Sequence, residues 1–237
     1  MTLKPPKILL VTYKQNKGVK KGMMQKKGWW ILVIVSVGIM IPFMIPYLTL
    51  NPANSRVDIT STTQYSILVT HIGCAFIALI TGFLQFMDRI RLKNPKVHRY
   101  VGRIYVVSVF ISGILALAVV FYIENFTKAA AFLTLAILWL FTCWKGYRTA
   151  AKGHFNAHRI WMMRSFGITL VAVSARVLVP VLLITYYTFN GFMLPEGRDK
   201  MIEEVLNVNI WAGLVLNFVI VEWIILNKKN RVEKSAN

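Results

Sequence analysis

Long runs of apolar residues, separated by short polar segments, dominate this sequence. Six such runs lie at about residues 29–50, 65–87, 100–122, 129–144, 160–189 and 208–226. A helix needs roughly 20 mainly apolar residues to cross the ~30 Å hydrocarbon core of a bilayer, and these runs are of that kind. The pattern therefore predicts an all-α membrane protein. We expect a six-transmembrane-helix bundle over residues 29–227, flanked by basic tails at residues 1–28 and 228–237.

The charged residues are divided unevenly between the polar segments. The chain has 28 Lys and Arg against 9 Asp and Glu, a net charge of +19. Of the basic residues, 23 fall in the two tails and around residues 88–103 and 145–164. Because basic loops remain on the cytoplasmic side, both termini are predicted to be cytoplasmic. This distribution favours contact with anionic lipid headgroups and argues against nucleic acid as a partner.

Composition supports the membrane assignment and adds little chemistry. Hydrophobic residues make up 56% of the chain, and the mean hydropathy is +0.55, which excludes an ordinary soluble domain. Cys74 and Cys143 lack the spacing of a metal site, and we expect them to pack in the core. Gly73 and Gly82 are expected to allow close approach of a neighbouring helix.

Three polar residues lie inside the predicted spans, where burial of a charge is costly. Counting 1.5 Å per residue places His71 and Arg176 in the same outer half of the membrane. An imidazole beside a guanidinium can hold a carbonyl or carboxylate, such as a quinone oxygen. The alternative is a polar cluster that only joins two helices. The third residue, Glu222, lies nearer the cytoplasmic side, where Arg164 or Arg103 can pair with it.

A second polar group lies on the predicted cytoplasmic side. His98 opens the third span and His158 opens the fifth, while His154 precedes His158 by four residues and can share its helix face. Two histidines at equal depth on different helices are what bis-imidazole haem ligation requires, and nearby arginines can bind the propionates. Contacts with lipid headgroups are the alternative interpretation. The arginines of this group are Arg99, Arg103, Arg159 and Arg164.

Three blocks of sequence carry a resemblance to a known family. They are HIGCAFIALITGFLQF (71–86), HRYVGRIY (98–105) and HRIWMMRSFGITLVAVSAR (158–176). In this order they resemble an uncharacterised bacterial family, domain-of-unknown-function family twenty-three hundred and six, known as "predicted membrane protein". The resemblance covers roughly residues 30–225 and implies a multi-pass helical fold in a bacterial cell membrane, without an activity. The residues that match the family's pattern are His71, Gln85, His98, Arg99, Gly102, Arg103, His158, Arg159, Trp161, Met162, Arg164 and Arg176.

A looser similarity is to b-type transmembrane cytochromes, in helix number and in histidines on consecutive spans. Those cytochromes pair histidines at two depths, and this chain departs from that pattern because His71 has no second histidine at its own level.

Two functional hypotheses follow from these residues. The first is a membrane redox component that binds haem b, a quinone or both. Its haem ligands would be His98 with His158 or His154, and its quinone contacts would be His71 and Arg176. The second is a non-enzymatic protein that binds a lipid or small anion, or that assists a membrane protein partner. The wider candidate ligand-binding set adds Gln85, Arg99, Arg103 and Arg164.

Overall fold

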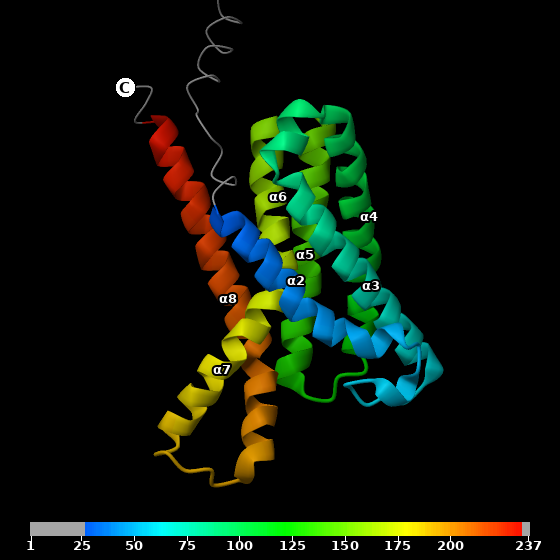
Figure 1. Ribbon diagram of the computed structural model, residues 1–237, viewed down its shortest axis with the longest axis vertical. Coiled ribbons are helices and arrows are strands. Elements are labelled where there is room, and N and C mark those ends of the chain that lie inside the picture. Colours follow the sequence, from blue (N-terminus) through cyan, green and yellow to red (C-terminus); the bar gives the residue numbers. More distant parts are fainter. Residues whose placement is uncertain (1–26, 234–237) are drawn as a thin grey trace, which may run out of the picture.

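Every regular element of the described chain is helical. The computed structural model describes residues 27–233 (Figure 1). The predicted N-terminal tail therefore lies, as far as residue 26, outside the described residues. Six helices in the described range are long and apolar enough to cross a membrane, which confirms the predicted fold class. In chain order the elements are α2 (Lys27–Leu48), the 3-10 turn η1 (Pro52–Asn54), α3 (Thr62–Gln85), the π-helical turn η2 (Arg89–Lys93), α4 (Pro95–Val120), α5 (Phe126–Ala151), α6 (Phe155–Thr169), α7 (Val171–Phe189) and α8 (Gly197–Glu233).

Local sequence explains where the middle helices begin. The Ser61 hydroxyl oxygen accepts a hydrogen bond from the Gln64 backbone N–H at the start of α3, at 3.1 Å. The Asn125 side chain accepts one from the Lys128 N–H at the start of α5, at 3.0 Å. Pro95 occupies the first turn of α4, where a backbone N–H has no helical partner. These residues start the helices three to five positions before the apolar runs that predicted them.

The fifth apolar run forms two helices, so the expectation of one continuous helix over residues 160–189 was wrong. The helices α6 and α7 meet at Leu170. The Asn217 side-chain amide of α8 donates to the Gly167 carbonyl at 2.9 Å. That carbonyl belongs to the last turn of α6, where carbonyls lack partners further along the helix. Pro180, the obvious helix breaker in the sequence, lies within α7 instead.

Consecutive helices pack as antiparallel pairs. The pairs α3–α4, α5–α6 and α7–α8 make the most extensive contacts, and α4 also packs along α5. Helix α2 crosses one face of this bundle obliquely, and α7 bends away from it together with the first part of α8 (Figure 1). The buried core is formed by Trp29, Ala78, Leu79, Phe83, Tyr105, Val109, Trp139, Cys143, Phe166 and Val173.

The structure tests the predictions made for the small residues Gly73, Gly82, Cys74 and Cys143. A Cβ on Gly82 would lie 2.4 Å from the Phe166 ring, so the predicted close approach at Gly82 is confirmed. A Cβ on Gly73 would meet nothing within 4 Å, so the same prediction for Gly73 was wrong. Cys143 is buried in the core and Cys74 is half-buried, and both are free thiols.

The bundle has two chemically different ends. We call "the basic end" the one formed by residues 86–99, residues 145–159 and the last turns of α8. The other, "the opposite end", carries the loops at residues 49–61, 121–125 and 190–196. The charge distribution predicts that the basic end faces the cytoplasm.

Cysteine labelling in intact cells tests this orientation. We expect a cysteine introduced for Glu196 to react with a membrane-impermeant maleimide, and one introduced for Lys96 to react only after the cells are opened. Both residues are exposed, so that access reports the side of the membrane. The background protein has Cys74 and Cys143 replaced by alanine. Labelling of the Lys96 position in intact cells would reverse the predicted topology.

Candidate functional site

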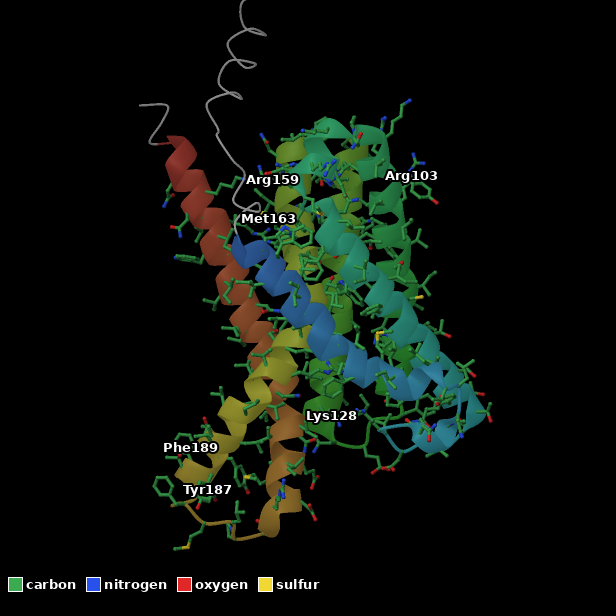
Figure 2. All side chains as sticks on the ribbon, in the orientation of Figure 1. Arg103, Lys128, Arg159, Met163, Tyr187 and Phe189 are labelled. Carbon is green, nitrogen blue, oxygen red and sulfur yellow. The ribbon has the colours of Figure 1, made fainter. Side chains whose placement is uncertain are left out.

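Arg164 and Glu222 form an ion pair between α6 and α8. The Arg164 Nε lies 2.6 Å from Glu222 Oε1, and Nη2 lies 3.1 Å from Oε2, so that the pair is bidentate. The guanidinium also lies over the Trp161 ring, 4.9 Å from its centroid. Of the two partners that the sequence offered for Glu222, Arg164 is confirmed. Arg103 is exposed and lies across the bundle from Arg159 (Figure 2).

A second polar group, which was not predicted from the sequence, lies in the centre of the bundle. The Tyr105 hydroxyl of α4 bonds to Ser165 Oγ at 2.8 Å and to Thr169 Oγ1 at 3.0 Å. The Trp139 indole N–H of α5 donates to the same Thr169 oxygen at 3.0 Å. Each of these polar atoms has a partner, so the network stabilises helix packing. Ser165 and Thr169, four apart on one helix face, were the available signal.

His71 is held by the backbone of the neighbouring helix. Its Nδ1 lies 2.9 Å from the Ser112 carbonyl oxygen of α4, and the Ser112 hydroxyl donates to the His71 carbonyl at 3.0 Å. The same Nδ1 also lies 2.9 Å from the Ser112 hydroxyl oxygen, so both polar groups of Ser112 contact the ring. His71 and Arg176 were predicted to hold one ligand together, and the structure does not bring them into hydrogen-bond contact.

Arg176 finds its acceptor on its own helix. Its Nη1 donates to the Ala172 carbonyl at 2.6 Å, and its guanidinium lies over the Phe43 ring of α2 at 4.4 Å from the centroid. Its Nε is buried without a hydrogen-bond partner among the described residues. This hydrogen bond stays within α7 and does not join Arg176 to His71.

His158 and His98 lie at the basic end. The Nδ1 of His158 lies 2.8 Å from the Gly146 carbonyl of α5, so Nδ1 carries the proton and Nε2 is the nitrogen with a lone pair. The Nδ1 of His98 is buried and has no partner in residues 27–233. The two imidazoles are near enough for their charges to interact. The Gln85 amide donates to the His98 carbonyl at 2.8 Å, which fixes the start of α4 against the end of α3.

Several basic side chains lie near one another at this end, and Arg91 among them lies near His98. Arg91 pairs with Asp88 at 2.5 Å, and its Nε is buried without a partner in the described range. Arg159 and Lys228 lie near enough to Arg91 and Asp88 for their charges to interact. The sequence interpretation missed Arg91 and Lys228, which lie in η2 and in α8 and belong to no local motif. Three of the predicted residues are exposed at this end and have no side-chain hydrogen bond within the described part of the chain: Arg99, Arg103 and His154.

The donor set at the basic end does not resemble a structural metal site. No three His, Cys, Asp or Glu side chains of residues 27–233 converge on one point. Two imidazoles with basic side chains nearby instead suit a ligand that carries negative charge.

The fold and its intramembrane polar pairs define a polytopic α-helical membrane protein. Residues 68–225 match the family described as "Predicted membrane protein (DUF2306)", and the chain belongs to this family. No curated protein and no solved structure matches the chain.

Proposed function

We propose that this protein is a membrane redox component that binds haem b between His98 and His158. The observation that carries the proposal is that two imidazoles, one from α4 and one from α6, lie near enough at the basic end for their charges to interact. These are two of the four histidines in the chain, and 60 positions of sequence separate them.

The orientation of His158 suits an axial ligand. Histidines that ligate metals normally donate their second ring N–H to a carbonyl or carboxylate, which fixes the tautomer and raises ligand basicity. The bond from His158 Nδ1 to the Gly146 carbonyl, at 2.8 Å, has this form. Gly146 packs against Met162 of α6, so the acceptor is held rigidly by the α5–α6 contact.

The surroundings suit the rest of a haem. The buried Nδ1 of His98 has no partner among the described residues, and a ligand at this position would satisfy it. Arg91, Arg159 and Lys228 lie around one carboxylate, Asp88, and the excess positive charge complements two propionates. When bound, haem b supplies one-electron transfer. The chain's own contribution is to orient the two imidazoles, hold the propionates and limit access of water.

Absorbance of the purified protein tests the proposal. We expect protein expressed with a haem supply to show a Soret band that shifts on dithionite reduction. Replacing His98 or His158 with alanine should remove at least about nine-tenths of this band, because each would supply one axial bond. His154→Ala is the matched control, since His154 is exposed and lies one turn from His158. A colourless wild-type protein would contradict haem binding, and full retention of the band in both variants would contradict ligation by His98 and His158.

A second candidate is a non-enzymatic protein that binds anionic lipid headgroups at the same end. Two observations favour it. Three basic side chains, those of Arg91, Arg159 and Lys228, lie near the single carboxylate of Asp88. A surface hollow is lined by Asp88, Arg89, Leu92 and Lys93. The same preparation distinguishes the two. Colourless protein that retains anionic lipid, and loses it in Arg91→Gln, would support this candidate.

A further inference from the structure

Two arginines from distant parts of the sequence contact one aromatic ring, that of Phe43. The Arg56 guanidinium carbon lies 4.7 Å from the Phe43 ring centroid, and that of Arg176 lies 4.4 Å from it. The two guanidinium carbons are therefore at most the sum of these distances apart, about 9.1 Å. The ring belongs to α2, which crosses the bundle beside the start of α7 (Figure 1).

Backbone carbonyls hold both side chains in this position. Arg56 Nη2 donates to the Pro42 carbonyl at 3.1 Å. Pro46, four residues further along α2, has no N–H to occupy that carbonyl, so it is free to accept from the loop. Arg176 is held from its own helix through the Ala172 carbonyl at 2.6 Å. The arrangement is thus fixed by α2, the loop and α7 together.

The charge of this pair is unbalanced. Neither arginine forms an ion pair with an acidic residue of the described chain, and residues 1–26 contain no Asp or Glu. Arg176 Nε is buried without a hydrogen-bond partner in the described range. A guanidinium has five N–H donors, and the one hydrogen bond made by each arginine leaves most of them unused. Arg176 is partly buried, and a partly buried cation normally has an acceptor, so its unsatisfied Nε beside a second guanidinium on the same ring indicates an anionic ligand.

We propose that the Arg56–Arg176 pair binds the phosphate group of an anionic phospholipid. Guanidinium groups bind phosphate through paired N–H donors, and the proposed phosphate would accept hydrogen bonds from both arginines at the edge of the Phe43 ring. The apolar surroundings favour a lipid, because α2 and α7 expose aliphatic side chains next to the pair. These are Ile41 and Ile45 on α2 and Val177 on α7. The site is independent of the histidine pair and of any haem.

Lipid binding by the purified full-length protein tests this site. Native mass spectrometry of detergent-solubilised protein titrated with phosphatidylglycerol would give the affinity of the wild type, Arg56→Gln and Arg176→Gln. We expect each variant to bind at least about tenfold more weakly, since each loses hydrogen bonds to a charged group. Arg198→Gln is the matched control, because Arg198 is exposed, lies in the first turn of α8 and makes no ion pair within residues 27–233. It should bind like the wild type.

Two further measurements identify the source of the phosphate and check that the variants fold. Inorganic phosphate that displaces the lipid from the wild type, but has no effect on the variants, would keep the phosphate site and assign it to a free anion. Circular dichroism melting checks that Arg176→Gln is folded. Arg56→Gln changes an exposed loop residue, and it tests the site even if Arg176→Gln unfolds. Wild-type affinity for phosphatidylglycerol in Arg56→Gln would overturn the proposal.

Discussion

Replacing Glu222 with glutamine is expected to lower the free energy of unfolding by about 3–5 kcal/mol, the cost of removing one partner of a buried ion pair. The bidentate contact with Arg164 crosses from α8 to α6, and the two side chains are only 23% and 31% exposed. An arginine left without its carboxylate at this position is costly, because an unpaired charge between packed helices is poorly compensated. Reversible unfolding in mixed micelles by a denaturing detergent would measure the loss.

Two further variants show whether the effect comes from the unpaired charge. Glu203→Gln removes an exposed partner of Lys200 at 3.3 Å, and it should cost no more than about 1 kcal/mol. The double variant Arg164→Met with Glu222→Gln should recover most of the lost stability, because no charge then remains unpaired. Equal losses in Glu222→Gln and in this double variant would mean that side-chain packing, rather than charge, holds the two helices together.

The second large effect is expected at Gly213, where α8 touches the backbone of α7. A Cβ at this position would lie 2.9 Å from the Ala175 backbone nitrogen and 3.1 Å from its Cα. Backbone atoms cannot move aside as the end of a flexible side chain can, so Gly213→Val must separate the two helices. We expect a loss of about 1–3 kcal/mol or more, as for other overpacked contacts. The same detergent unfolding assay would measure it.

Gly73→Val provides the control for this prediction. Gly73 also lies within a membrane-spanning helix, and a Cβ there would meet nothing within 4 Å. The two variants add the same side chain, so the difference between them isolates the helix contact. A loss at Gly73 as large as that at Gly213 would show that valine itself, and not the α7–α8 contact, is responsible.

The sequence by itself determined the class of the protein, the approximate spans and the polarity of the bundle ends. The length and apolarity of a segment are local properties of the sequence. The thickness of the bilayer fixes how long an apolar helix must be to cross it, so the spans can be predicted from them. The cost of charge inside a membrane also made Arg164 and Glu222 predictable partners, because each needed a counter-charge at its own depth. The family resemblance added the positions that match its pattern, without a role for any of them.

Tertiary structure decided which polar groups meet, because this depends on how helices rotate and cross. Depth along separate helices suggested His71 beside Arg176, yet rotation turns His71 towards Ser112 and Arg176 towards Phe43. Arg56 was assigned to a loop, and only the crossing of α2 places it on the same ring as Arg176. Beside the break at Leu170, the Gly167 carbonyl accepts from Asn217, which is 47 positions further along the chain than Leu170. The apolar run of a helix sets where that helix crosses the membrane. Packing against neighbouring helices sets which way each side chain points. That direction depends on residues far away in the sequence.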